Sequence, residues 1–301
     1  MRKKRQWGGL QTRPTTSFLM MSPWLLLFFV FTVLPIIAAI CLSFTYFNMV
    51  SAPRFIGLSN YLRLFLDDDV FLIAVKNTLI FSIITGPVGY LLSFVIAWFI
   101  NDTGRRMRPL LTLLFYSPTL AGNVYFIWMF IFSGDSVGLL NSSLMRLHLI
   151  YEPIKWLTDP KYNIYACMVV MLWMSMGAGF LAFVAGFKQL NHSLFEAAAI
   201  DGLRNRWQEL FYVTLPQMVP QLLIGAVLSI SGAFAVGYQC MALTGFPSTD
   251  YSTHTIVLHI LDYGNNRFEM GYASAIAVVL FCAMILTWNI INKALSSISE
   301  D

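Results

Sequence analysis

The sequence predicts an all-α membrane protein with six transmembrane helices and both termini in the cytoplasm. Hydrophobic residues make up 57% of the chain and charged residues only 11%, whereas about 25% of a typical soluble domain is charged. Six stretches contain no Asp, Glu, Lys or Arg, and each exceeds the roughly 20 residues that a helix needs to cross the hydrocarbon core of a bilayer. Lysine and arginine also gather in the connections on one side, which orients the helices.

Each predicted helix lies within one charge-free stretch. The stretches are residues 14–53, 77–101, 109–134, 162–187, 210–249 and 271–292. The helix cores are expected near residues 18–42, 78–100, 110–132, 164–187, 218–244 and 271–291. A basic tail, residues 1–17, precedes the first helix, and a tail of residues 293–301 follows the last.

The first apolar stretch follows a basic tail, as a signal peptide would. It is too long for one, at about 25 residues, and no small-x-small cleavage site comes after it. We therefore expect it to be the first span.

Orientation follows from the positions of lysine and arginine. The tails and the connections expected in the cytoplasm hold twelve: Arg2, Lys3, Lys4, Arg5, Arg13, Arg105, Arg106, Arg108, Lys188, Arg204, Arg206 and Lys293. The longer opposite connections hold Arg54, Arg63, Arg146, Lys155, Lys161 and Arg267. Because basic residues favour the cytoplasmic side, both termini are predicted to lie there. The same residues account for the net charge of +4, so no nucleic-acid partner is expected.

A polar segment, residues 188–217, separates the fourth and fifth spans. Ser193 with Glu196, and Asn205 with Gln208, stand at capping-box spacing. Between them, Asp201-Gly202 predicts a sharp turn in which glycine has a positive φ. The pattern predicts two short helices whose apolar residues dock on another surface.

This segment resembles the EAA loop of binding-protein-dependent ABC importers. The motif residues are Glu196, Ala197, Ala198, Gly202, Thr214, Leu215 and Pro216. They keep the family's spacing over about twenty residues, although Thr214 stands where an aliphatic residue is usual. A solvated loop that merely joins two helices is the alternative, and it leaves the capping residues and Trp207 unexplained.

The resemblance extends from Trp24 to about Leu286. Phe55-Ile-Gly-Leu-Ser-Asn-Tyr61, Asn77-Thr78, Pro118, Gly138-Leu-Leu-Asn141 and Trp156-Leu-Thr-Asp-Pro160 follow in the order found in MalF-like permeases of carbohydrate importers. The chain departs at Leu243-Thr-Gly-Phe-Pro247 and lacks the large extra domain of the maltose permease. The resemblance implies a type I ABC importer permease fold, with a sugar other than maltose as its substrate.

The resemblance also implies the partners and the coupling residues. Glu196, Ala197, Ala198, Asp201 and Gly202 would insert into a groove on an ATP-binding cassette subunit, where Glu196 can pair with a basic residue. A second, MalG-like permease, two ATPase subunits carrying ATP and Mg, and a soluble sugar-binding protein would complete the importer in a bacterial inner membrane.

Two arguments give candidate residues for the substrate path. The resemblance implies Thr119, Met171, Met174, Ser175, Ala178, Ser229, Gly232, Ala233 and Val236. Polar residues within spans usually face protein or water rather than lipid, which adds Tyr116, Asn123, Tyr125, Tyr238 and Gln239. For this second group, hydrogen bonds between helices remain an equal alternative. Ser82, Ser93 and Gly86-Pro87 are expected to be packing and kink residues instead.

No enzymatic chemistry is expected in this chain. It has no Gly-Lys dipeptide and hence no phosphate-binding loop, so another chain must bind ATP. Its four cysteines fall inside predicted spans without paired spacing, and its four histidines form no metal pattern. The function alternative is an autonomous secondary transporter of a polar solute. The predicted spans contain no Asp or Glu that could relay a proton, which favours the importer.

Overall fold

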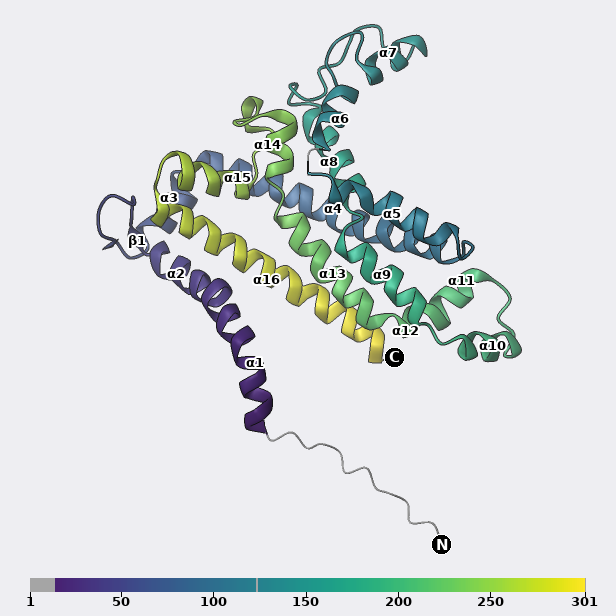
Figure 1. The fold of residues 1–301 in the computed structure, drawn as a ribbon. Coiled ribbons are helices and arrows are strands. Elements are labelled where there is room, and N and C mark those ends of the chain that lie inside the picture. Colours follow the sequence, from purple (N-terminus) through teal and green to yellow (C-terminus); the bar gives the residue numbers. More distant parts are fainter. Residues whose placement is uncertain (1–13, 123, 301) are drawn as a thin grey trace.

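The computed structural model describes residues 14–122 and 124–300, and helices dominate it (Figure 1). Within these residues, four helices are long and apolar enough to cross a membrane. Two bent helix pairs raise the number to six if each pair forms one span. The predicted all-α membrane fold is confirmed in this form. Residues 1–13 of the basic tail and Asn123 lie outside the described residues.

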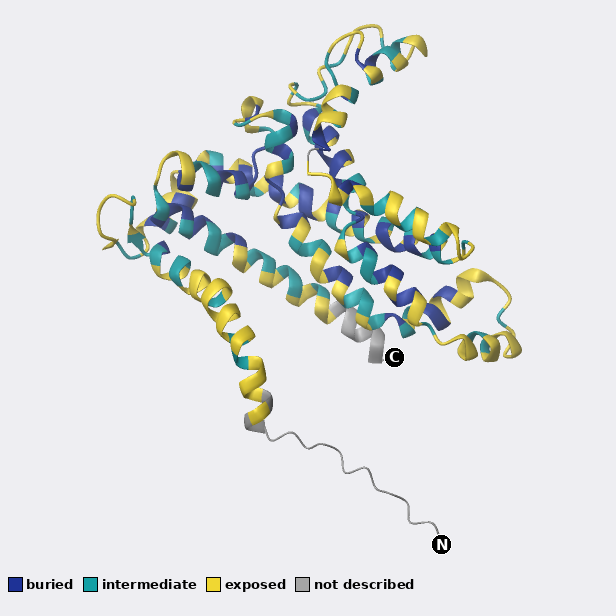
Figure 2. Ribbon diagram, viewed as in Figure 1, coloured by how far each residue is buried: buried dark blue, intermediate teal, exposed yellow. Residues whose placement is uncertain are grey.

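The first span is a nearly continuous helix. It consists of α1 (Pro14–Phe28), a π-helical turn (Phe29–Val33) and α2 (Leu34–Ser43). None of its most apolar window is buried by the rest of the chain, and only α2 packs against α16 (Figures 1 and 2). A small antiparallel pair, β1 (Thr45–Tyr46) and β2 (Arg54–Phe55), follows, with Thr45 opposite Phe55.

The central helix starts earlier than its apolar stretch does. After α3 (Ser59–Leu66), helix α4 runs over Asp69–Asn101, although its core was predicted to begin near residue 78. The Asp68 carboxylate accepts a hydrogen bond from the Phe71 N–H at 2.9 Å. This N-cap satisfies a free backbone donor, so the helix can begin several residues before the charge-free stretch.

Three further spans are interrupted or bent. They are α5 (Met107–Leu120) with α6 (Tyr125–Ile131), α8 (Asn163–Met174) with α9 (Ala178–Gln189), and α13 (Val219–Phe234) with α14 (Tyr238–Thr244). The last span, α16 (Met270–Glu300), is one continuous helix. An angle of 89° separates α5 from α6. The sequence predicted each of the three pairs as one span.

Short helices fill the connections. They are α7 (Leu139–Arg146), α10 (His192–Ile200), α11 (Arg206–Glu209), a π turn (Leu210–Thr214), α12 (Leu215–Gln217), a 3-10 turn (Thr249–Tyr251), α15 (Ile256–Leu261) and a second π turn (Asp262–Asn266). Helices α10–α12 lie at one end of the bundle and α3 with α15 at the other (Figure 1).

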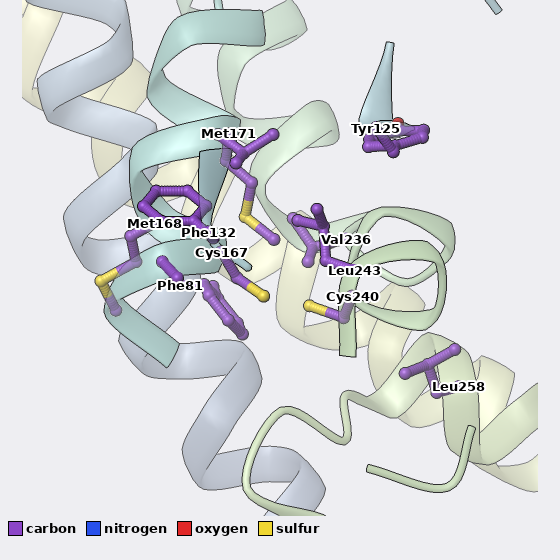
Figure 3. Packing of buried hydrophobic residues seen from close by; sticks show 12 residues of the cluster. Phe81, Tyr125, Phe132, Cys167, Met168, Met171, Val236, Cys240, Leu243 and Leu258 are labelled. Carbon is purple, nitrogen blue, oxygen red and sulfur yellow. The ribbon is translucent and has the colours of Figure 1, made fainter. Parts of the chain in front are cut away.

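Helix α4 forms the centre of the bundle because it packs against α9, α13, α8 and α15. Buried side chains form three clusters along it. One contains Phe81, Cys167, Met171, Val236 and Cys240, and it joins α4, α8 and α14 (Figure 3). A second surrounds Phe94, Phe180 and Phe183, between α4 and α9.

Candidate functional site: an interhelical cavity and a polar segment

A cavity of about 330 Å³ lies between α4, α5, α8–α9 and α13–α14. Its volume is at the lower end of the range for small-molecule pockets. The wall is lined by Thr85, Gly86, Gly89, Tyr90, Thr119, Met171, Met174, Ser175, Gly177, Ala178, Gly179, Leu228, Ser229, Gly232, Ala233, Val236 and Gln239. None of these lining residues is ionisable at neutral pH, since the only titratable group among them is the phenol of Tyr90. The cavity therefore suits an uncharged solute.

Breaks in two helices form part of this wall. Helix α8 ends at Met174 and α9 begins at Ala178, while α13 ends at Phe234 and α14 begins at Tyr238. Such breaks free backbone carbonyl groups, which membrane proteins tolerate only when protein or water satisfies them. Hydroxyl groups from neighbouring segments donate to them here. Ser93 Oγ donates to Ser175 O at 3.2 Å, Thr119 Oγ1 to Met176 O at 3.2 Å and Thr255 Oγ1 to Val236 O at 2.7 Å.

Some polar groups of the wall are already engaged, and others are available. Thr119 donates to a backbone carbonyl, as does Ser175, whose Oγ lies 2.7 Å from Leu172 O. Gln239 Oε1 accepts from the Gly237 N–H at 3.2 Å. The Ser229 hydroxyl and the Gln239 amide nitrogen have no hydrogen-bond partner among the described residues. These two groups can bind a solute's hydroxyl groups without breaking an existing bond.

The structure brings most of the predicted path residues to this cavity. Thr119, Met174, Ser175, Ser229, Gly232 and Gln239 line it, as do Met171, Ala178, Ala233 and Val236. It does not bring Tyr125 and Tyr238 there. Their rings pack edge to face at 5.7 Å, and Tyr125 belongs to the cluster of Figure 3. Tyr116 lines another pocket, and Asn123 lies outside the described residues.

Helix α4 supplies wall residues that sequence reasoning assigned to packing or did not single out. Gly86, Gly89 and Tyr90 all line the cavity, although Gly86 was expected to belong to a kink. A Cβ added to Gly89 would lie 2.8 Å from Ser175 Cβ. The available signal was the spacing of Gly86, Gly89 and Tyr90 on one helical face, since small residues allow helices to approach closely.

The polar segment, residues 188–217, forms the predicted pair of short helices. Asn191, not Ser193, caps α10, because Asn191 Oδ1 accepts from Ser193 N at 3.1 Å. The second capping prediction is confirmed, since Asn205 Oδ1 accepts from Gln208 N at 2.8 Å. Gly202 has φ +96°, as the predicted turn requires.

The second helix of this segment, α11, packs against the rest of the chain, whereas the first, α10, is exposed. Trp207 packs on Trp98 of α4 with ring centroids 5.4 Å apart, and Arg206 forms an ion pair with Asp102. Helix α10 has no buried residue. Leu194 and Ile200 are 47% and 87% exposed, and the carboxylate of the exposed Glu196 has no partner among the described residues. Helix α10 therefore presents an unpaired carboxylate beside apolar surface.

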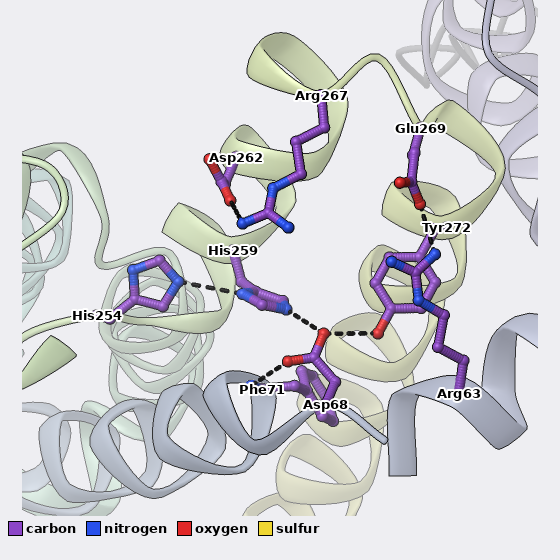
Figure 4. Close-up of polar contacts among 9 residues, drawn as sticks. All are labelled: Arg63, Asp68, Phe71, His254, His259, Asp262, Arg267, Glu269 and Tyr272. Carbon is purple, nitrogen blue, oxygen red and sulfur yellow. Dashed lines mark hydrogen bonds and ion pairs between the residues drawn. The ribbon is translucent and has the colours of Figure 1, made fainter. Parts of the chain in front are cut away.

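A buried polar network holds the opposite end of the bundle together (Figure 4). Tyr272 Oη donates to Asp68 Oδ2 at 2.7 Å, and His259 Nε2 lies 3.0 Å from the same oxygen. His254 Nε2 lies 3.1 Å from His259 Nδ1. Asn77 Nδ2 donates to the carbonyl oxygen of His254 at 2.9 Å. The network joins α4, α15 and α16 beside the α13–α14 break.

The pKa shifts agree with an ionised carboxylate and neutral imidazoles. Burial alone would raise the pKa of Asp68, but hydrogen bonds from Tyr272 and Phe71 N, with the neighbouring His259, hold it below its usual value. Burial lowers the pKa of His259 despite the opposing effect of Asp68. Burial, with His259 as a second cause, lowers the pKa of His254 to about 4. Neutral His259 can thus donate from Nε2 to Asp68 and accept at Nδ1 from His254.

The sequence matches a known family and its curated relatives over most of its length. Residues 87–297 match the family described as the binding-protein-dependent transport system inner membrane component. The probable ABC transporter permease protein YesP of Bacillus subtilis is 30% identical over 93% of this chain and 90% of its own length. The lactose transport system permease protein LacF of Rhizobium radiobacter is 28% identical over 88% of each chain. The arabinooligosaccharides transport system permease protein AraP of B. subtilis is 29% identical over 98% of this chain and 93% of its own length.

Solved structures share the fold. The crystal structure of a bacterial ABC transporter involved in the import of the acidic polysaccharide alginate matches with a TM-score of 0.77 at 22% identity, over 95% of this chain and 97% of that chain. The alginate transporter in complex with its alginate pentasaccharide-bound periplasmic protein matches with a TM-score of 0.76 over 98% and 99%. At 22% identity the likeness shows the fold alone, and it confirms the predicted type I ABC importer permease fold.

Proposed function

Since the chain belongs to the family of binding-protein-dependent transport system inner membrane components, we propose that it forms, with a second permease, the membrane path of an ATP-driven importer for an oligosaccharide or related sugar. A periplasmic or extracellular binding protein delivers the sugar. Two separate ATP-binding cassette subunits hold ATP and Mg and supply the energy. The complex resides in the bacterial cytoplasmic membrane. Family membership decides against the autonomous secondary transporter.

The cavity between α4, α9 and α13 supports this proposal most directly. It combines apolar walls with the free hydrogen-bonding groups of Ser229 and Gln239, and an oligosaccharide offers both hydroxyl groups and apolar ring faces. Relatives named for lactose and arabinooligosaccharide transport support the same substrate class. The uncharged wall favours a neutral sugar, because an unpaired carboxylate loses hydration there without a cationic partner.

The polar segment, residues 188–217, which we call the docking segment, supports a coupling role. Glu196, Ala197 and Ala198 lie on α10, which this chain leaves uncovered, and Asp201 with Gly202 forms the turn after it. In our proposal, α10 inserts into a groove of an ATPase subunit and Glu196 pairs with a basic residue there. Movements of that subunit then reach the cavity through Trp207 and Trp98, at the end of α4.

Cysteine accessibility tests the path. In an assembled importer whose four native cysteines, Cys41, Cys167, Cys240 and Cys282, are replaced, single variants Ser229→Cys and Gln239→Cys should react with a small aqueous thiol reagent. The transported sugar should slow this reaction. Val227→Cys lies on the same helix but outside the cavity lining, and it serves as the matched control. Equal labelling of all three sites, with no effect of sugar, would exclude this path.

A further inference from the structure

A second pocket lies at the end of the bundle that holds α10–α12. It has a volume of about 780 Å³ and is formed by the start of α5 and the end of α9. Three cations, Arg105, Arg108 and Lys188, line it. Neither the substrate path nor the proposed ATPase contact uses these residues.

The positive charge of this pocket has no counter-ion in the described chain. Arg105, Arg108 and Lys188 form no ion pair with any described residue. The carboxylate of Asp102, at the end of α4, is paired with Arg206 instead. Arg108 is half-buried, whereas Arg105 and Lys188 are exposed. Three cations gathered at one pocket without a carboxylate partner make it electropositive, so an external anion is the missing partner.

Arg108 carries a further unsatisfied group. Its Nη2 donates to the backbone oxygen of Asn101, and this bond fixes the guanidinium. Its Nε is buried and has no hydrogen-bond partner among the residues that the structure describes. Arginine presents its N–H groups in a rigid fork that matches phosphate and carboxylate oxygens. The fork of Arg108 is held in place with one donor still lacking an acceptor.

The pocket also has an apolar wall. Pro109, Leu113 and Tyr116 line it beyond the cations. Leu110 and Leu114 extend this surface along α5 and are 60% and 63% exposed. A free inorganic anion would use the cations only. A ligand with an anionic head and hydrocarbon tails would use the whole surface.

We propose that this pocket binds the phosphate headgroup of an anionic phospholipid, with its acyl chains along α5. The predicted orientation places the pocket in the cytoplasmic leaflet, where anionic headgroups occur and where basic pockets between transmembrane helices bind them. Lys188 lies three residues before Asn191, the cap of α10. The bound lipid therefore holds the root of the docking segment, residues 188–217, in place.

The test measures binding of phosphatidylglycerol to the complete purified importer in nanodiscs of phosphatidylcholine. The double variant Arg105→Gln/Lys188→Gln should weaken binding at least tenfold, because it removes two of the three cations. Both side chains are exposed, so the fold should persist. The matched control is Arg106→Gln, which removes one charge next to the pocket but outside its lining, and it should change binding less than twofold. Arg108→Gln should act like the double variant.

Three results would overturn the proposal. Equal lipid affinity in the double variant and in the control would show that the pocket is not the site. Competition by inorganic phosphate at the same concentration as phosphatidylglycerol would show an anion site without a lipid requirement. Loss of the second permease from the double variant, with lipid binding unchanged in the remaining chain, would assign the cations to a contact between permeases. None of these readouts depends on sugar transport, so they stand apart from the test of the path.

Discussion

Gly202 is the residue that turns the chain between α10 and α11. Its φ of +96° lies in a region that side chains with a Cβ rarely adopt, and an added Cβ would meet no atom within 4 Å. Any effect of substitution is therefore a backbone effect. Gly202→Val should destabilise the turn by about 1–2 kcal/mol and reduce both binding-protein-stimulated ATPase activity and sugar uptake.

Gly104 offers a matched control for that prediction. It lies in another connection at the same end of the bundle, an added Cβ there also meets nothing, and its φ is not positive. Gly104→Val should leave coupling intact. Full stimulated ATPase activity and uptake in Gly202→Val would remove the coupling role from this turn.

The buried histidines make a second prediction, on pH. The pKa of His254 falls from 6.5 to about 4 on folding, so the unfolded chain binds protons more readily between these values. The stability from neutral His254 is present above pH 6.5 and is lost as the pH falls toward 4. His259 has a pKa shift of the same sign. Acidification from pH 7 to pH 5 should cost about 2 kcal/mol through His254, which is measurable as a lower melting temperature.

Asp68 adds a loss at lower pH. Folding lowers the pKa of Asp68 below its ordinary value of 3.8. The stability that the ionised carboxylate contributes is therefore present above pH 3.8, and it is lost as the pH falls through the lower pKa of the folded state. In a His254→Gln variant the melting temperature should depend less on pH between pH 7 and pH 5. The loss of stability at lower pH, where Asp68 takes up a proton, should remain. A melting temperature that is equally pH-dependent in this variant would assign the proton to another group.

Some of the residues that line the cavity could be predicted from the sequence. Gln239 could be proposed because polar groups in a span need a polar environment, and the resemblance implied Ser229 together with its less polar neighbours. Tyr125 and Tyr238 satisfied the same polar argument, yet their rings pack on each other away from the cavity. Sequence alone does not distinguish the two cases, because both place amphipathic side chains on an apolar helix.

At the scale of elements, the interrupted helix α13–α14 allows a prediction about the volume of the cavity. Gly232 lines the cavity, and an added Cβ would meet no atom within 4 Å. Gly232→Leu should project into the cavity and reduce uptake more than tenfold, while basal ATPase activity and the melting temperature stay near wild type. Val227→Leu enlarges a side chain on the same helix outside the lining and should transport normally. Normal uptake by Gly232→Leu would place the path elsewhere.

The sequence could locate the spans but not their interruptions. Composition marks the apolar stretches, and the cap at Asn205 and the turn at Gly202 follow local rules that hold in the structure. The breaks after Met174 and Phe234 depend on distant partners. Ser93, Thr119 and Thr255 satisfy the freed carbonyl groups from other segments. The early start of α4 could not be predicted from composition either. The N-cap at Asp68 stabilises the first turn of the helix, although charged residues follow it.

For the whole molecule, we predict that this chain alone hydrolyses no ATP and accumulates no sugar. It contains no phosphate-binding loop, and no residue that is ionised at neutral pH lines the cavity between α4, α9 and α13. Reconstituted alone with imposed proton and sodium gradients, it should show no uptake of labelled oligosaccharide. The same liposomes with the second permease, both ATPase subunits, the binding protein and ATP should accumulate it. Gradient-driven uptake by the lone chain would contradict its role as a subunit.

The bare first span has a consequence for how the protein is made. Its main partner within the chain, α16, begins about 230 residues after α2 ends, which is roughly 10–45 seconds of synthesis at about 5–20 residues per second. During that interval the span must remain in lipid without the contacts that it later makes. It is also the most apolar of the four long candidate spans. Hydrophobicity there serves insertion first, and the contact between α2 and α16 forms only after α16 has been synthesised.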